Sequence, residues 1–273
     1  MADEFRSHGL VVFDDEASAL AALGQYLHHR ELMANARRNG PLPRRRSAGG
    51  QVTMLSEVAA LSFLRGARIP AVESIVCATV DEARAAFDRL GGVPVAVKGC
   101  PRRATHKSEL GLVHLGLDSA VAVEEAAEAL MVTMAALDLD AEGVLVSPMI
   151  TGVIEGLIGA HVDPVFGPVV LVGAGGKYVE ALDDVQALVP PFSADDVKAA
   201  IGRLRIAPLL AGVRGEPPTN VAAWVDATLR LADLMLENPA VTSVDVNPLL
   251  LSAAGGSLDF GALAVDAVVE IRQ

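Results

Sequence analysis

The chain has 273 residues, 52% of them hydrophobic and only 4% aromatic, with a formal net charge of −12 and a pI of about 4.9. An acidic surface of this kind repels nucleic-acid phosphates and anionic membranes, so neither is an expected partner. The two cysteines form no disulfide framework and suit a reducing cytosol, and no apolar run approaches the ~20 residues of a membrane helix. These properties predict an acidic, cytoplasmic α/β protein of one large or two modest domains.

The first fifty residues are predicted to form a short strand–helix segment and a linker. Residues 10–13 have the apolar pattern of a strand, and Asp14 or Asp15 can cap a helix that runs to about residue 36. Residues 37–50 combine prolines, glycines and five arginines, a composition typical of an exposed linker. Because one strand and one helix cannot bury a core, this segment is expected to pack on the rest of the chain or on a partner.

The remaining chain alternates strand and helix patterns and is predicted to form two α+β lobes, 51–146 and 147–273. Periodicity of the apolar residues predicts helices over 56–66, 81–90, 122–137, 194–204 and 220–237. Predicted strands lie at 74–78, 93–98, around 115, and at 143–149, 155–162, 168–172, 178–182, 244–251 and 262–271. The predicted fold class is therefore α/β, of the α+β kind.

A predicted strand near the C-terminus carries an acid and an amide on one face. Residues 244–248 read VDVNP, and because residues two apart share a strand face, Asp245 and Asn247 point the same way. Their oxygens can help to hold a hard cation such as Mg²⁺, although a plain polar strand end is the alternative. Asp266 lies in the apolar stretch ALAVDAVVEI, where a buried carboxylate needs a metal, a cation or N–H donors. If the last two strands pair, Asp266 can reach Asn247 and form a Mg²⁺ site that nucleotide phosphates complete.

Three other features are candidates for phosphate chemistry. Gly175 and Gly176 follow the strand VVLV, where their N–H groups can cradle an anion or simply form a hairpin turn. Lys98 ends a predicted strand, where it can bind a nucleotide phosphate as a point charge or lie exposed to solvent. His106 stands in a polar loop with nearby cations, and it can act as a nucleophile that carries a phosphoryl group or be a solvated loop residue.

Together these motifs resemble, in order and spacing, the ATP-grasp (β) part of ADP-forming acetyl-CoA and acyl-CoA synthetases, distant relatives of succinyl-CoA synthetase. The segments that carry the resemblance are LSEVAALSFLRGARIP, PVAVKGC, HKSELGLV, DPVFGPVVLVGAGGKYVE, LLAGVRGEPP, VDVNPLLL and AVDA. The resemblance implies an ATP-grasp fold that holds nucleotide between two lobes. It also implies the reversible reaction of acyl-CoA, ADP and phosphate to acid, CoA and ATP through phosphohistidine.

The resemblance assigns roles to individual residues. His106 would carry the phosphoryl group, and Asp245 would lie beside that group during transfer. The residues that would contact ATP or ADP are Lys98, Gly175, Gly176 and Glu180. The residues that would hold Mg²⁺ are Asn247 and Asp266. Arg214 and Glu216 lie in a motif typical of the family, with no role assigned.

The first fifty residues are similar to the tail of the CoA-ligase domain that precedes ATP-grasp in fused family members. This chain is therefore expected to be a separate subunit with a CoA-binding (α-type) subunit as its partner, or one piece of a longer enzyme. The acyl pocket is expected to lie in the CoA-binding part. The sequence specifies neither the acyl group nor the choice between ATP and GTP.

The chain departs from the family pattern at several positions. In the loop that usually reads HK[ST]DxGG, Glu109 replaces the Asp and Leu112 replaces the second Gly, which narrows the backbone freedom of the loop. Ser147-Pro148 replaces a Gln-Glu pair, and an arginine common near Leu188 is absent. These departures keep open an alternative function, a nucleotide-binding regulatory or interaction module without turnover. A ligase that makes an acyl phosphate for another acceptor is a third possibility, but it would need no phosphohistidine.

Overall fold

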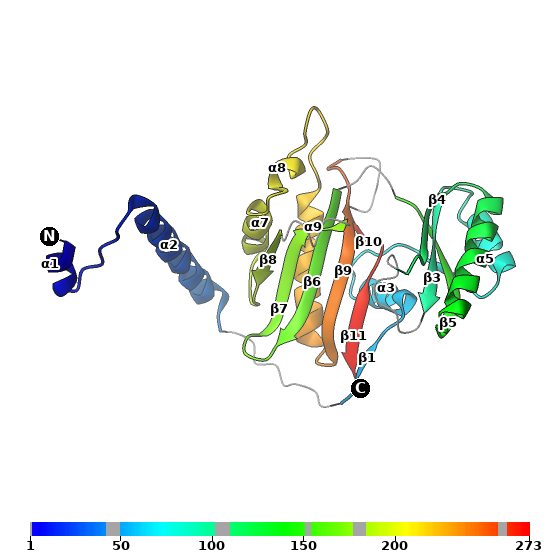
Figure 1. Cartoon of the computed structure of the whole chain (residues 1–273), viewed down its shortest axis with the longest axis horizontal. Coiled ribbons are helices and arrows are strands. Elements are labelled where there is room, and N and C mark those ends of the chain that lie inside the picture. Colours follow the sequence, from blue (N-terminus) through cyan, green and yellow to red (C-terminus); the bar gives the residue numbers. More distant parts are fainter. Residues whose placement is uncertain (1, 42–49, 102–109, 151–153, 177–183, 256–260) are drawn as a thin grey trace. The chain divides into compact units, whose positions relative to one another are not determined.

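A computed structural model describes residues 2–41, 50–101, 110–150, 154–176, 184–255 and 261–273, and it divides into two units, Met1–Leu42 and Pro43–Gln273. Helices and antiparallel strands make up the larger unit (Figure 1). Among the described residues, no helix combines the length and the apolar character needed to cross a membrane.

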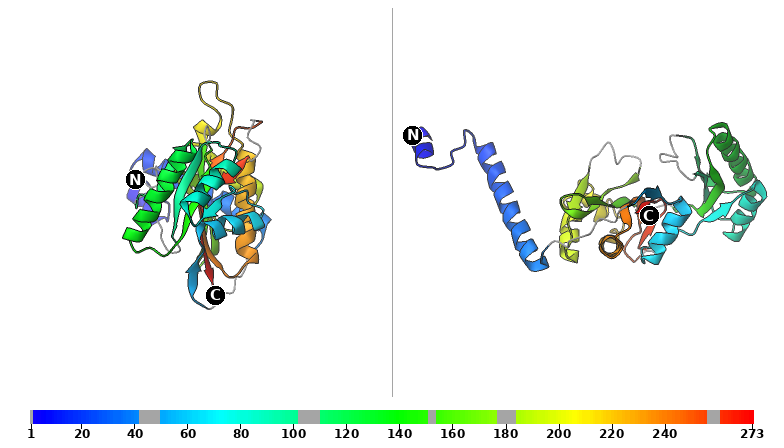
Figure 2. Two further views of the ribbon diagram at one scale, coloured as in Figure 1. Left: turned by 90° about the vertical axis from the view of Figure 1, so that its right-hand side faces the viewer. Right: turned by 90° about the horizontal axis from the view of Figure 1, so that it is seen from below.

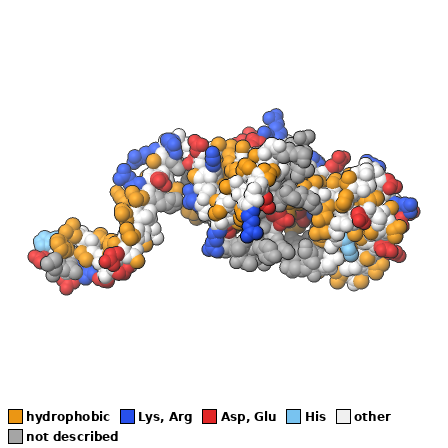
Figure 3. Space-filling view, turned by 90° about the horizontal axis from the view of Figure 1, so that it is seen from above, with side chains coloured by type: hydrophobic (Ala, Val, Ile, Leu, Met, Phe, Trp, Pro, Cys, Tyr) orange, Lys and Arg blue, Asp and Glu red, His pale blue; other side chains and the backbone are white. Residues whose placement is uncertain are grey.

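The N-terminal unit consists of two helices, α1 (Ala2–Ser7) and α2 (Glu16–Asn39). The predicted cap of α2 is confirmed, because the Asp15 carboxylate accepts a hydrogen bond from the backbone N–H of Ser18 at 2.8 Å. The predicted strand over 10–13 is wrong: these residues form no strand. Figure 3 shows apolar side chains open on the surface of this unit, and Leu20 on α2 is 67% exposed. A unit of this size cannot bury a core of its own.

A four-stranded antiparallel sheet forms the centre of one part of the larger unit. In spatial order its strands are β2 (Ile75–Cys77), β5 (Ala141–Pro148), β3 (Val95–Pro101) and β4 (Val113–Leu117). The helices that pack on it are α4 (Val80–Arg89) and α5 (Ala120–Ala136). Thr79 and Ser119 cap these helices with their side-chain oxygens, and Phe87 and Leu130 fill the core between helices and sheet.

A seven-stranded antiparallel sheet forms the second part. Its path is β1 (Val52–Met54), β11 (Val268–Arg272), β9 (Val241–Leu251), β6 (Ile154–Asp163), β7 (Gly167–Ala174) and β8 (Val185–Leu188), with β10 (Ala262–Ala264) paired to β9. The helices of this part are α3 (Glu57–Gly66), α7 (Ala194–Gly202), α8 (Ala207–Leu210) and α9 (Val221–Glu237). Helices α3, α7 and α9 cover one face of the sheet, which leaves the other face for the residues described below (Figure 2).

The helices predicted between residues 51 and 273 are all present, but the strands differ in three places. β1 and β8 were not predicted, and the predicted strand 262–271 is broken at 265–267. The predicted strand 178–182 lies outside the described residues.

The small sheet is inserted into the chain between α3 and β6. β1 pairs with β11, with Val52 opposite Arg272, and Leu61 and Leu64 of α3 are buried in the core of the large sheet. Residues of the predicted first lobe, 51–146, therefore contribute to both sheets.

Candidate functional site

Lys98 lies on β3 of the small sheet, and its side chain forms hydrogen bonds with groups in the part of the molecule built around the large sheet. Its Nζ donates to Glu57 Oε1 at 2.9 Å, to the carbonyl oxygen of Val265 at 3.0 Å and to Asp266 Oδ2 at 3.3 Å. Its side chain is only 9% exposed, so the alternative of a solvent-exposed lysine at a strand end is wrong. The contacts join β3 to the start of α3 and to the bend between β10 and β11.

Two carboxylates keep Lys98 charged despite its burial. Burial by itself would lower the pKa of the Lys98 ammonium group. The negative charges of Glu57 and then Asp266 outweigh that effect and raise the pKa of Lys98 above its ordinary value. Lys98 is therefore a fixed positive charge at the place where the two sheets meet.

Asp245 and Asn247 lie on the face of β9 that points away from the core. Val244 and Val246 are buried in the core of the large sheet, whereas Asp245 is exposed and Asn247 is half-buried. This is the alternation that the sequence predicts. The face of the sheet opposite to the helices therefore carries both polar side chains.

Asp266 lies beside the same stretch of β9. The N–H of Val265 donates to the carbonyl oxygen of Pro248 at 3.4 Å, and Val268 pairs with Asp245. Asp266 is thus held opposite the stretch 246–248 by its two neighbouring segments. The break in the predicted strand makes this possible, because the bend turns Asp266 toward Lys98.

The oxygen atoms at this place fit a divalent cation. Dense protein around the exposed Asp245 carboxyl desolvates it and, together with the charge of Asp266, raises the pKa of Asp245 above its ordinary value. The carboxylates of Asp245 and Asp266 and the amide oxygen of Asn247 are the kinds of oxygen ligand that a hard cation prefers. Within the described part of the chain, no three His, Cys, Asp or Glu side chains are grouped to hold a metal. Mg²⁺ is commonly held by only a few protein ligands, with other oxygen donors completing its coordination.

The glycine turn after β7 is attached to this site through Asn247. Gly175 donates its N–H to the carbonyl oxygen of Glu155 at 3.0 Å, and Gly176 donates its N–H to Asn247 Oδ1 at 2.9 Å. The Gly176 N–H, predicted as a candidate anion donor, is therefore engaged with a side chain of the site. Gly176 has φ +77°, a conformation that favours glycine.

Gly175 is required by a close backbone approach, which gives a first testable prediction. A Cβ at Gly175 would collide with the carbonyl oxygen of Gly156 on β6, a backbone atom that cannot rotate aside. We expect Gly175→Ala to lower the free energy of unfolding by ~1–3 kcal/mol in urea denaturation. Gly202→Ala is the matched control, because its Cβ would meet nothing within 4 Å. Equal stability of the two variants would contradict the close approach.

Two predicted site residues, His106 and Glu180, lie outside the described residues. The segment 102–109 that contains His106 directly follows β3, the strand that carries Lys98. The segment 177–183 that contains Glu180 directly follows the glycine turn.

Sequence reasoning missed Glu57, the most deeply buried acid of the site. Ser56, the residue before α3, makes no side-chain cap hydrogen bond, and its neighbour Glu57 pairs with Lys98. An acid in the first turn of a helix is ordinary, since it favours the positive end of the helix dipole. The available signal was that Glu57 falls on the apolar side of α3, near Leu61 and Leu64.

The departures from the family pattern fall mainly on buried positions. Leu112 is fully buried, and a Cβ at Gly99 would lie 3.3 Å from the Leu112 Cβ, so Gly99 leaves room for that side chain. Ser147 is buried in β5, and Leu188 is 9% exposed in the core of the large sheet. Arg214 is exposed, as is its neighbour Glu216, in the segment between α8 and α9.

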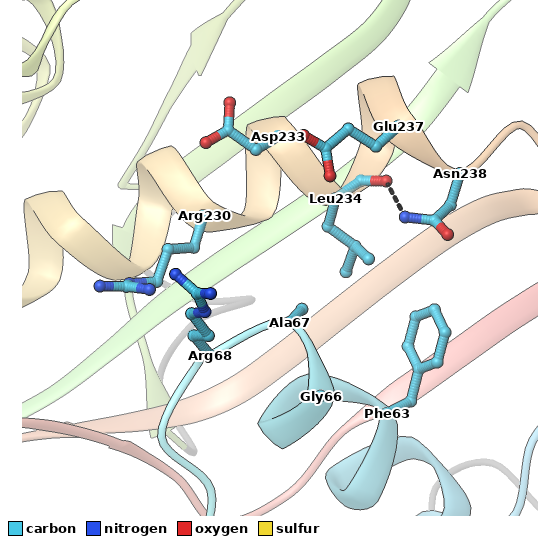
Figure 4. A pocket seen from close by; sticks show the side chains of 9 residues that line it. All are labelled: Phe63, Gly66, Ala67, Arg68, Arg230, Asp233, Leu234, Glu237 and Asn238. Atoms are coloured by element: carbon cyan, nitrogen blue, oxygen red, sulfur yellow. Dashed lines mark hydrogen bonds between the residues drawn. The ribbon is translucent and has the colours of Figure 1, made fainter.

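A pocket of about 620 Å³ lies between α3 and α9, and the predicted site residues do not line it (Figure 4). Its lining residues are Phe63, Gly66, Ala67, Arg68, Arg230, Asp233, Leu234, Glu237 and Asn238. The side chains of Arg68 and Arg230 lie close together in the view, and Asp233 and Glu237 project from α9. Both signs of charge are present, so the lining does not select a simple anion or a simple cation.

Comparison with known proteins decides the family. Residues 46–271 match the family model described as the ATP-grasp domain. The chain is also 33% identical over 215 residues to the β subunit of acetate–CoA ligase [ADP-forming] I from Pyrococcus furiosus, covering 78% of this chain and 90% of that subunit. This chain belongs to the ATP-grasp family of ADP-forming acyl-CoA synthetases. The ATP-grasp fold predicted from the motifs is thereby confirmed.

Other similar proteins match this chain at a comparable identity, but the share of their own length that the match covers differs. A trans-feruloyl-CoA synthase from an unknown prokaryotic organism is 34% identical over 194 residues, but the match covers 70% of this chain and only 27% of that protein. Among solved structures, the chain matches a dinucleotide-forming acetyl-coenzyme A synthetase from Ca. Korarchaeum cryptofilum, which was solved in complex with coenzyme A, Ca-AMPCP and HgCl⁺. The match has a TM-score of 0.73 and 30% identity, and it covers 89% of this chain and 99% of that chain. In another structure of the same protein, with coenzyme A and Mg-AMPPCP, the phosphohistidine segment points towards the nucleotide binding site; it matches with a TM-score of 0.67 and 29% identity over the same shares of the two chains.

Proposed function

We propose that this chain is the nucleotide-binding subunit of an NDP-forming acyl-CoA synthetase and transfers a phosphoryl group between ATP or ADP and His106. One observation carries the proposal: Lys98 of the small sheet lies 3.3 Å from Asp266 of the large sheet. The residue expected to contact phosphate therefore touches the residue expected to hold Mg²⁺. We propose that the two sheets are the two lobes that enclose the nucleotide.

The site residues supply charge and position rather than covalent chemistry. Lys98 offers a fixed positive charge to phosphate oxygens, and Asp266 with Asn247 would hold Mg²⁺, which would supply further positive charge to the phosphates. The glycine turn keeps Asn247 in place through the Gly176 N–H. This division of labour suits phosphoryl transfer, where positioning and electrostatic stabilisation dominate.

The covalent step belongs to His106 in this proposal. A ring nitrogen of His106 forms a P–N bond as the bond between the β–γ bridging oxygen and the γ-phosphorus of ATP breaks, and ADP leaves. In the direction of ATP synthesis the phosphoryl group returns to ADP. The segment 102–109 that contains His106 follows the strand of Lys98 in the chain, and the phosphohistidine segment named in the Korarchaeum structure supports the assignment.

The complete reaction, acyl-CoA + ADP + phosphate = acid + CoA + ATP, requires a CoA-binding partner in this proposal. The Pyrococcus relative is a β subunit, and the exposed apolar side chains of α2 offer a surface for a partner of this kind. Cys77 and Cys100 are buried thiols, which is in keeping with the proposed cytoplasmic location.

Intact-mass analysis after incubation with Mg-ATP tests the proposal, with and without the CoA-binding partner. We expect the wild-type chain to gain one acid-labile phosphoryl group and His106→Ala to gain none, because the P–N bond forms on that ring. Nucleotide binding by calorimetry without any phosphoryl gain, even with the partner present, would favour the alternative of a regulatory module without turnover. Absence of both binding and phosphoryl gain would contradict the proposed function.

A further inference from the structure

Glu57 holds Lys98 more firmly than Asp266 does. The Glu57 side chain is 1% exposed and its Oε1 lies 2.9 Å from Lys98 Nζ, whereas the Asp266 side chain is 35% exposed and its Oδ2 lies 3.3 Å from Nζ. A carboxylate as deep as that of Glu57 is costly unless a positive charge stays beside it. Asp266, in contrast, faces solvent from which a cation can arrive.

We propose that Glu57 is a positioning residue that keeps Lys98 at the nucleotide site when a divalent cation replaces Lys98 at Asp266. The proposal rests on the proposed function and adds an exchange of partners to it. Without a cation, Lys98 balances the charge of Asp266. With a cation on Asp266, repulsion weakens the contact between Lys98 and Asp266. Lys98 then remains bonded to Glu57 and to the carbonyl oxygen of Val265, and its third N–H is available for phosphate.

The charges around Lys98 predict that the cation competes less well for the Asp266 carboxylate when Glu57 loses its charge. In Glu57→Gln, Lys98 depends more on Asp266 and competes more strongly with the cation for that carboxylate. The site also becomes less negative, which leaves the cation with less attraction. Both effects act in the same direction, so the concentration of Mg²⁺ needed for tight nucleotide binding rises.

Calorimetric titration of a non-hydrolysable ATP analogue at a series of Mg²⁺ concentrations measures this effect. We expect the Mg²⁺ concentration for half-maximal affinity to rise about tenfold in Glu57→Gln, equivalent to ~1.4 kcal/mol. Glu57→Asp keeps the charge and should give a smaller rise. Asp196→Ala is the control for lost stability, because it removes the side-chain acceptor of the capping box of α7 outside the site and should leave the Mg²⁺ dependence unchanged.

Each outcome bears on a different claim. An unchanged Mg²⁺ dependence in Glu57→Gln, with normal binding by the wild type, would overturn the role of Glu57 but not the nucleotide site. Absence of analogue binding by the wild type would overturn the proposed function itself.

A measurement on the unaltered chain decides the matter if neither Glu57 variant folds. The chain has four lysines, so reductive methylation followed by mass spectrometry can report on Lys98 separately. We expect Lys98 to react slowly and to react faster when Mg²⁺ is added without nucleotide, while the exposed Lys198 stays constant. No change at Lys98, at Mg²⁺ concentrations that saturate nucleotide binding, would overturn the exchange.

Discussion

Replacing Lys98 with Met is expected to reduce phosphoryl transfer from Mg-ATP by about 10²–10³-fold, the usual effect of removing one group that stabilises developing charge. The same change is expected to lower the free energy of unfolding by ~3–5 kcal/mol, because it leaves the buried carboxylate of Glu57 without the Lys98 charge. Urea denaturation measures the stability, and intact-mass kinetics with Mg-ATP measure the transfer.

A second variant separates the two effects of Lys98. In the double variant Glu57→Gln/Lys98→Met the buried charge is gone along with its partner, so most of the lost stability should return. Phosphoryl transfer should stay low, because the positive charge of Lys98 no longer reaches the phosphates. A double variant as unstable as Lys98→Met would contradict the strong pairing of Glu57 with Lys98. Normal transfer in either variant would contradict phosphate binding by Lys98.

Local periodicity predicted the parts of the site that lie on one element. Asp245 and Asn247 share a face of β9 because alternate residues on a strand must do so, and the buried Val244 and Val246 fix which face that is. Similarly, the apolar row on α9 identified a helix that packs on the large sheet. These features depend only on neighbours in the sequence.

The contacts that assemble the site could not be predicted in this way. Lys98 meets Glu57 and Asp266, which are 41 and 168 residues away along the chain, and nothing local to any of the three indicates the other two. The position of Asp266 depends on a bend between β10 and β11, in a stretch whose apolar composition is typical of one continuous strand. Pairing with β9 on either side of the bend, rather than propensity, sets that geometry.

Asp266→Asn is expected to weaken Mg²⁺-dependent nucleotide binding while leaving the free energy of unfolding almost unchanged, whereas Lys98→Met is expected to lower both activity and stability. Residues that merely support a metal ligand are worth 10–100-fold in metal affinity, so losing the charge of a direct ligand should weaken Mg²⁺-dependent nucleotide binding by about 100-fold. Stability should change by no more than ~1 kcal/mol, because the side chain is 35% exposed and partly exposed ion pairs contribute little. Lys98 also keeps its bonds to Glu57 and to the carbonyl oxygen of Val265.

Calorimetry with and without Mg²⁺, together with urea denaturation, measures both quantities for Asp266→Asn. Asp233→Asn on α9 is the matched control: it removes an exposed acid outside the site, so Mg²⁺-dependent binding should stay at the wild-type level. A loss of stability in Asp266→Asn as large as that in Lys98→Met would mean that Asp266 serves mainly as a structural counter-ion of Lys98. Stability near wild type with weakened Mg²⁺-dependent binding would instead mean that Glu57 holds Lys98 in place and leaves Asp266 available to the cation.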